Sequence, residues 1–133
     1  MIPRFLYRAY ALFVFLPLFL IVSLITAIVT IVGCKLGNGH FWGYYPGKLW
    51  SCFTLRMLFL PVKVEGRENL VSGQSYVFVS NHQGSFDIFL IYGFLGRNFK
   101  WMMKKGIRKI AFVGEACASA HHIFVDKSGA SKI

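Results

Sequence analysis

The sequence predicts an α/β fold in which N-terminal membrane helices precede a largely parallel sheet with flanking helices. Residues 11–34 carry no charge, and a run of about 24 apolar residues is long enough to cross the hydrocarbon layer as a helix. After residue 62, short β-branched and aromatic runs alternate with apolar helical stretches, which favours a parallel sheet. We therefore divide the chain of 133 residues into a membrane-anchoring two-helix segment, 1–62, and the N-terminal part of an α/β domain, 63–133.

The first apolar run is predicted to be an uncleaved membrane anchor. Arg4 and Arg8 precede it, as they would in a secretory signal, but the run is longer than the 7 to 15 residues typical of a signal's apolar region. The sequence IVGC at residues 31–34 resembles a bacterial lipoprotein cleavage site, so lipidation at Cys34 stays open as an alternative.

Several glycines and Pro46 interrupt the helical pattern after residue 33, and the aromatic residues among them suit headgroup depth. The second apolar stretch, 49–62, carries Arg56 near its centre and is too short to span comfortably. We expect a re-entrant or interfacial helix that ends at Pro61, with a buried core helix as the alternative.

Strands and helices are expected to alternate through the rest of the chain. Residues 62–64 predict a short strand and residues 75–80 a buried one, because they are rich in β-branched and aromatic side chains. A turn at 81–84 leads to a helix that Ser85 can cap and that runs to Gly93 or Gly96. A strand at 99–103, a helix at 107–118 and a strand at 123–125 complete the expected elements.

Charge and composition favour a lipid surface as partner. The net charge is +10, and no acidic residue occurs before Glu65, while basic residues flank the apolar segments. This distribution argues against nucleic acid as a partner, although charge and aromatic content alone would fit one. Three cysteines without a C-x-x-C pair indicate free thiols in a reducing compartment, and no metal is expected at His121 and His122, because adjacent residues of a strand point to opposite faces.

His82 lies in the predicted turn and Asp87 in the first turn of the following helix, so their side chains can converge. A carboxylate bonded to one ring nitrogen fixes the tautomer and leaves the other nitrogen able to accept a proton from a hydroxyl. The alternative is structural: Asp87 would favour the positive end of its helix, and His82 would bond turn carbonyls.

Four stretches resemble the glycerolipid acyltransferases, in particular the 1-acyl-glycerol-3-phosphate acyltransferases. NHQGSFD, with Asn81, His82, Gln83 and Asp87, resembles their first motif, N-H-x-x-x-x-D. KVEGRENL at 63–70 is similar to the lead-in to that motif, and MKKGIRKIAFVG at 103–114 to K-x-E-L-x-x-I-P-x-x-G. HHIFVDK at 121–127 resembles the second motif, G-x-I-F-I-D-R.

The resemblance implies a reaction and roles for seven residues. His82, held by Asp87, would deprotonate the free hydroxyl of lysophosphatidate. The hydroxyl oxygen would then attack the thioester of acyl-CoA or acyl carrier protein, and no cofactor would be needed. The residues expected to contact substrate are Asn81, Gln83, Ser85, Lys104 and Lys127. A cluster of six basic residues between Arg97 and Lys109 could hold phosphates or face headgroups. We expect the catalytic part on the cytoplasmic side of a cell membrane, namely a bacterial inner membrane.

The sequence also departs from the family pattern. Lys127 stands where the family has arginine, Gly106 where it has glutamate, Ala111 where it has proline and His121 where it has glycine. The third motif, around P-E-G-T-R, does not occur in these 133 residues, so we expect a truncated member with an incomplete sheet. A non-catalytic membrane protein that binds lipid with half of the fold is the alternative.

Overall fold

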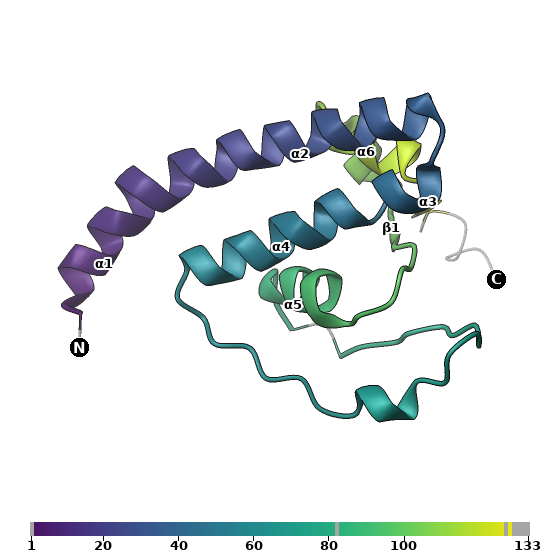
Figure 1. Ribbon diagram of the computed structural model, residues 1–133. Helices are drawn as coiled ribbons and strands as arrows, with labels where there is room; N and C mark the ends of the chain where they lie inside the picture. The colour runs from purple at the N-terminus through teal and green to yellow at the C-terminus, as the bar shows by residue number, and fades with distance from the viewer. Residues whose placement is uncertain (1, 82, 127, 129–133) are drawn as a thin grey trace.

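The computed structural model describes residues 2–81, 83–126 and 128. A long N-terminal helix runs beside a shorter returning helix, and a compact group of helices with a small sheet packs against this pair (Figure 1). The mixed helical and parallel-sheet composition agrees with the predicted class. Most of the chain is helical, however, and the sheet has two strands within the described residues.

The N-terminal helix is continuous from α1 (Arg4–Tyr10) through a π-helical turn, η1 (Ala11–Phe15), into α2 (Leu16–Leu36). Pro17 explains the wide turn, because its ring has no N–H to donate and crowds the carbonyl of Phe13. By length and composition the helix Arg4–Leu36 could cross a membrane: its mean hydropathy reaches 2.9 over 18 residues, and 6% of that window is buried. It contains the predicted run and extends it by a turn or more at its N-terminal end.

Two helices follow the turn at Gly37, α3 (Gly39–Trp42) and α4 (Tyr45–Met57). The Asn38 side chain caps α3 by accepting a hydrogen bond from the N–H of Phe41 at 3.0 Å. The predicted second helix, 49–62, therefore begins earlier and ends earlier than expected. Pro46 lies in the first turn, where a missing N–H costs nothing, and the chain leaves the helix at Leu58.

The tightest packing lies between α4 and α5 (Phe86–Phe94). A Cβ on Gly47 would lie 2.5 Å from the ring of Tyr92, so the absence of a side chain there lets the two helices approach. Tyr92 stacks on Tyr44 at 5.7 Å between ring centroids, and Tyr44 and Leu55 are fully buried. This apolar contact places α5 firmly on the helix pair.

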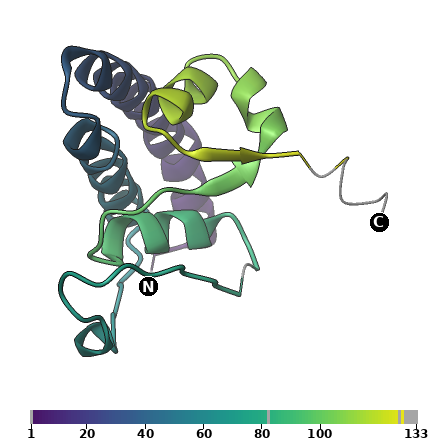
Figure 2. The same ribbon diagram turned by 90° about the vertical axis from the view of Figure 1, so that its right-hand side faces the viewer.

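The sheet pairs β1 (Met102–Lys104) with β2 (Ile123–Val125) in parallel, and Lys104 lies opposite Val125. The connection between them contains the 3₁₀ turn η3 (Lys105–Lys109) and helix α6 (Val113–Ser119), which is the crossover expected between parallel strands. Figure 2 shows both strands pointing the same way, with α6 packed on one side. The predicted strand at 123–125 is confirmed, the one at 99–103 is shifted toward Lys104, and the predicted helix 107–118 is split.

The predicted strands at 62–64 and 75–80 are wrong. Both segments are extended but pair with no strand among the described residues. Val77 and Val79 are each 92% exposed, so the face that we expected to be buried is open. The physical reason is that strands are stabilised by a hydrogen-bonded neighbour, and β1 pairs with β2 instead.

Two arginines tie the long loop between α4 and α5 to the C-terminal end of α5. A 3₁₀ turn, η2 (Arg67–Asn69), carries Arg67, whose guanidinium donates to the carbonyl of Phe94. Arg97 donates to the carbonyl oxygens of Leu70 at 3.2 Å and Val71 at 2.6 Å. The loop that leads to residue 81 is therefore anchored without a sheet.

Candidate active site

The turn before α5 is organised around Asp87. One oxygen of its carboxylate, Oδ2, accepts hydrogen bonds from the backbone N–H groups of Gln83 at 2.7 Å and Gly84 at 3.0 Å. The N–H of Asp87 in turn donates to the carbonyl of Gly84 at 3.2 Å. The half-buried carboxylate thus holds the backbone of residues 83–87 in one conformation, in the first turn of α5 as predicted.

His82 and Lys127 lie outside the described residues, so the predicted meeting of His82 and Asp87 stays a prediction. Three other predicted site residues, Asn81, Gln83 and Ser85, are exposed around the turn. Ser85 stands at the N-cap of α5 as expected. Within the described part of this turn its hydroxyl makes no capping hydrogen bond, and Asp87 binds the preceding backbone instead.

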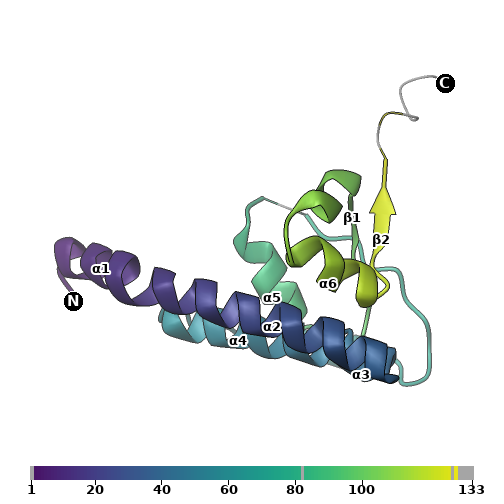
Figure 3. The ribbon, with the colours of Figure 1, turned by 90° about the horizontal axis from the view of Figure 1, so that it is seen from above.

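The turn and the sheet present their ends on the same side of the molecule. The N-terminal end of α5 and the carboxyl ends of β1 and β2 point the same way in Figure 2, and in Figure 3 they face the same side of the molecule. Lys104 is the last residue of β1 and is exposed. Loops at the carboxyl ends of parallel strands are where ligands bind in α/β proteins, so this side is the candidate active site.

The basic cluster from Arg97 to Lys109 does not form one face. Arg97 is used to anchor the loop, and the Nζ of Lys100 is buried, with no hydrogen-bond partner among the described residues. Burial lowers the pKa of Lys100. Four members remain exposed near the carboxyl end of β1, namely Lys104, Lys105, Arg108 and Lys109. The predicted phosphate contact, Lys104, belongs to this exposed group.

Asp126, directly after β2, is organised by its neighbours. Ser128 donates to its Oδ1 from both the hydroxyl, at 2.6 Å, and the backbone N–H, at 3.0 Å, and Lys105 lies 3.5 Å from Oδ2. The hydrogen bonds from Ser128 and the charge of Lys105 hold the pKa of Asp126 below its usual value. Asp126 therefore orders the chain at the end of β2 next to the basic group.

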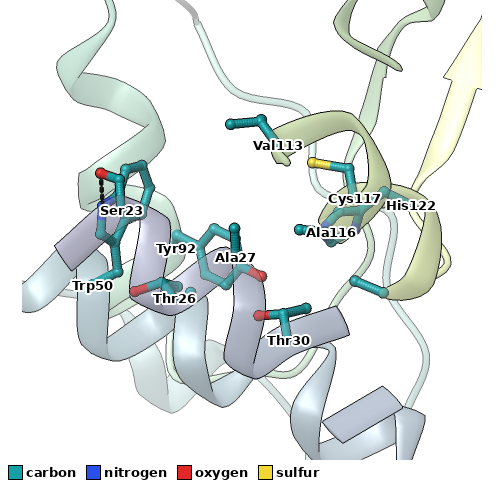
Figure 4. Close-up of a pocket in the computed structure, with 12 residues that line it drawn as sticks. Ser23, Thr26, Ala27, Thr30, Trp50, Tyr92, Val113, Ala116, Cys117 and His122 are labelled. Atoms are coloured by element: carbon teal, nitrogen blue, oxygen red, sulfur yellow. Dashed lines mark hydrogen bonds between the residues drawn. The ribbon is translucent and has the colours of Figure 1, made fainter. Parts of the chain in front are cut away.

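A cavity of about 130 Å³ lies apart from this turn, between α2, α4, α5 and α6 (Figure 4). Its lining is apolar apart from a few groups, among them Thr30 of α2 and His122, which precedes β2. His122 accepts a hydrogen bond on Nδ1 from the N–H of Trp101 at 3.2 Å, and burial together with the charge of Lys100 lowers its pKa to about 4. His122 is therefore a neutral structural residue.

Among the described residues, no three histidine, cysteine or acidic side chains lie close enough together to hold a metal ion. His121 and His122 differ sharply, because His121 is exposed at a φ of 59° whereas His122 is buried.

Sequence reasoning missed Gly114 and the role of Arg97. A Cβ on Gly114 would lie 2.1 Å from the carbonyl oxygen of Arg108, so only glycine fits where the η3 turn meets α6. Its place as the last glycine of MKKGIRKIAFVG was a signal that could have indicated this. For Arg97 the sequence offered only a basic residue in a cluster, which does not distinguish a loop anchor from a phosphate ligand.

Residues 61–133 match the family described as Acyltransferase. This match covers more than half of the chain and includes the turn, both strands and α6. The chain belongs to the Acyltransferase family.

Curated relatives support the family assignment. A chloroplastic 1-acyl-sn-glycerol-3-phosphate acyltransferase of Arabidopsis thaliana is 38% identical over 74 residues, 55% of this chain and 20% of that protein. The 1-acyl-sn-glycerol-3-phosphate acyltransferase of Saccharomyces cerevisiae is 29% identical over 101 residues, 76% of this chain and 33% of that protein. An uncharacterized acyltransferase of Schizosaccharomyces pombe is 28% identical over 125 residues, 94% of this chain and 44% of that protein.

This acyltransferase chain therefore spans less than half the length of these curated relatives. No solved structure matches it.

Proposed function

We propose that this protein takes part in acyl transfer to the free hydroxyl of 1-acyl-glycerol-3-phosphate, giving phosphatidate. The observation that carries the proposal is the family match over residues 61–133, which contains the N-H-x-x-x-x-D motif, together with relatives named for this activity. The Asp87-centred turn adds support, because a carboxylate that accepts two backbone N–H groups is fixed in place for a catalytic partner.

In the proposed mechanism His82 is the general base and Asp87 its positioning residue. A carboxylate has about four lone-pair sites, so Asp87 can accept from the imidazole in addition to the N–H groups of Gln83 and Gly84. The other ring nitrogen of His82 removes the proton of the acceptor hydroxyl as the oxygen attacks the thioester carbonyl carbon. The carbon–sulfur bond then breaks, and the imidazolium returns its proton to the departing thiolate of coenzyme A or acyl carrier protein. General base catalysis contributes about 10²- to 10⁴-fold in rate.

Positive charge at the carboxyl end of the sheet suits the phosphate of the acceptor. Lys104, Lys105 and Arg108 are exposed there, and Lys127 follows β2 in the sequence. A lysine attracts phosphate as a point charge but lacks the two-pronged geometry of arginine, so we expect Lys127 to hold the acceptor less rigidly than the arginine of the family motif would.

Association with a membrane completes the proposal. The helix Arg4–Leu36 is apolar and largely exposed, and the acceptor lipid resides in the bilayer. The helix pair α2 and α4 would hold the turn at 81–87 near the interface, where the hydroxyl of a lysolipid is accessible.

Conversion of lysophosphatidate to phosphatidate tests the proposal. Membranes that contain the chain are supplied with labelled acyl-CoA or acyl carrier protein, and phosphatidate is quantified. We expect His82→Ala and Asp87→Ala to lower the rate by at least about 100-fold, because each removes general base catalysis. Glu115→Gln is the matched control, since this exposed carboxylate of α6 pairs with Lys35 of α2 and belongs to none of the predicted site residues. Lipid binding without turnover in the parent chain would instead favour the non-catalytic alternative.

A further inference from the structure

A second groove lies on the helix pair, on the side away from the cavity of Figure 4. Its volume is about 430 Å³, which is in the range of about 300–1,000 Å³ typical of sites for small ligands. Thr26 of α2 and Trp50 of α4 line both spaces, so the contact between α2 and α4 separates them. All of the groove's lining residues precede residue 61, and it therefore lies outside the part of the chain that matches the family.

The walls of the groove are apolar faces of two helices. Val22, Ile25 and Val29 recur at helical spacing along α2, and Leu49 and Phe53 do so along α4. Ile25 and Leu49 are 54% and 68% exposed, so the described part of the chain leaves them largely uncovered. The side-by-side course of α2 and α4 is visible in Figures 1 and 3. An extended hydrocarbon chain fits such a surface, because it buries apolar area along the whole length of the groove.

One end of the groove is lined by aromatic side chains, and Lys48 lies beside it next to Tyr45. Phe41 stacks on Tyr45 at 4.6 Å and meets Trp42 edge-on at 5.1 Å, and the Nζ of Lys48 lies 5.9 Å from the centre of the Tyr45 ring. Aromatic side chains of this kind favour headgroup depth, and a lysine there attracts anionic lipids. Among the described residues, Lys48 forms no salt bridge that would neutralise this charge.

We propose that this groove binds one acyl chain of an anionic phospholipid of the bilayer, with its phosphate at Lys48. The proposal rests on the membrane association in the proposed function and adds a lipid that is bound but not converted. The described residues of the turn, 81 and 83–87, do not line the groove, so we take the lipid bound here to be distinct from the acceptor of acyl transfer. Its role would be to fix the helix pair at a defined depth in the membrane.

Tryptophan quenching by brominated lipids tests the proposal directly. Trp42 and Trp50 line the groove, and Trp101→Phe removes the remaining tryptophan of the chain. The full chain with this change is placed in phosphatidylcholine vesicles that contain a minor fraction of phosphatidylglycerol, and one lipid at a time carries bromine on its acyl chains. We expect brominated phosphatidylglycerol to quench about fivefold more effectively per molecule, which corresponds to about 1 kcal/mol for one lysine near an anionic headgroup.

Matched variants separate the headgroup from the chain. Lys48→Gln should bring the quenching ratio of the two lipids to about one. Lys63→Gln, at an exposed lysine that pairs with Glu65 and does not line the groove, should leave the ratio at about fivefold, equivalent to about 1 kcal/mol. Val29→Phe should fill the groove and weaken quenching by both lipids, and Val32→Phe, on the same helix but outside the lining, should not.

Equal quenching by the two lipids in the parent chain, unchanged by Lys48→Gln, would overturn the proposal. Groove-facing cross-links between two copies would also overturn it, because a second chain would then cover Ile25 and Leu49. Phosphatidate formation in the same vesicles reports on the proposed function separately. Absence of quenching by either lipid would contradict membrane insertion itself, and with it this proposal.

Discussion

At the scale of single residues, Gly114 is the described glycine at which an added Cβ would come closest to a neighbouring atom. The carbonyl oxygen of Arg108 lies where a Cβ on Gly114 would stand, at 2.1 Å, and backbone cannot yield as a flexible side chain can. We expect Gly114→Ala to lower the free energy of unfolding by about 2–3 kcal/mol, the upper range for overpacking. Thermal and urea unfolding followed by circular dichroism in detergent micelles would measure this loss. Gly106→Ala is the control, because a Cβ there meets nothing within 4 Å. Equal stability of both variants would contradict the packing at α6.

His121 occupies a backbone conformation that favours glycine, the residue the family motif has at this position. Its φ is 59°, a left-handed conformation that costs a residue with a side chain about 1–2 kcal/mol. Glycine avoids this cost but loses about 0.5–1 kcal/mol through its freer unfolded chain. We therefore expect His121→Gly to raise the free energy of unfolding by about 0.5–1 kcal/mol. His121→Ala keeps the strained φ and should give no gain in the same urea titration, so a gain of equal size in that variant would point to another cause.

His122 makes stability depend on pH in a defined direction. Its pKa falls from the ordinary 6.5 to about 4 because the ring is buried and faces Lys100, so the folded protein favours the neutral form. Unfolding exposes a histidine that binds a proton below pH 6.5. This proton binding lowers the free energy of the unfolded state and so reduces the stability of the folded protein. The stabilisation is therefore complete above about pH 6.5 and is lost as the pH falls toward about 4, by up to about 3 kcal/mol.

The variant His122→Asn should flatten this pH dependence. The Asn oxygen can replace Nδ1 as acceptor for the N–H of Trp101 but does not titrate in this range. Subtracting the unfolding free energies of the variant from those of the parent, at steps between pH 7 and pH 4, isolates the histidine. A parallel profile for His122→Asn and the parent would contradict this expectation, because it would mean that the pKa of His122 is the same in the folded and the unfolded protein.

At the scale of elements, the sequence predicted correctly those helices and strands that interactions between neighbouring residues stabilise. The helix α5 begins one residue after Ser85 and keeps Asp87 in its first turn, and β2 has the predicted bounds. Segment 75–80 has the composition of a buried strand, but pairing depends on a neighbour that composition cannot name, and Val77 and Val79 are exposed instead. The same limit applies to the candidate site. The sequence indicated Asp87 and Lys104, whereas the two N–H groups that Asp87 binds follow from the folded turn.

The loop between α4 and α5 depends on Arg97. Its guanidinium binds the carbonyls of Leu70 and Val71 and lies 5.9 Å from the centre of the Tyr76 ring, so it fixes residues that lack a sheet partner. We expect Arg97→Gln to release the loop by about 1–2 kcal/mol, seen as about 5- to 30-fold faster amide exchange across residues 70–76. Lys109→Gln, an exposed change in the same cluster, should leave that exchange unaltered. Unchanged protection in Arg97→Gln would assign the loop's order to Arg67 alone.

At the scale of the whole molecule, the N-terminal helices and the family-matched part form one packed unit. Helix α2 contacts α4 along one side and α6 along another, and Phe89 of α5 lies 4.8 Å from Trp50 and 6.1 Å from Phe19 between ring centres. Residues outside the family match therefore supply much of the apolar surface on which α5 and α6 rest. The turn at 81–87 is positioned by this support, since α5 begins within it.

This dependence predicts that residues 58–133 do not fold without the helices before them. Removing residues 2–57 would expose Tyr92 and Gly93, which are buried against Tyr44, Gly47 and Cys52. The two-stranded sheet that remains is too small to be stable alone. We expect the shortened chain to lack a cooperative unfolding transition and the near-ultraviolet circular dichroism of packed aromatic rings. Deletion of residues 2–6 alone, whose side chains are exposed, should preserve both signals. A cooperative transition in the shortened chain would show instead that the family-matched part is an autonomous domain and that the helix pair only anchors it.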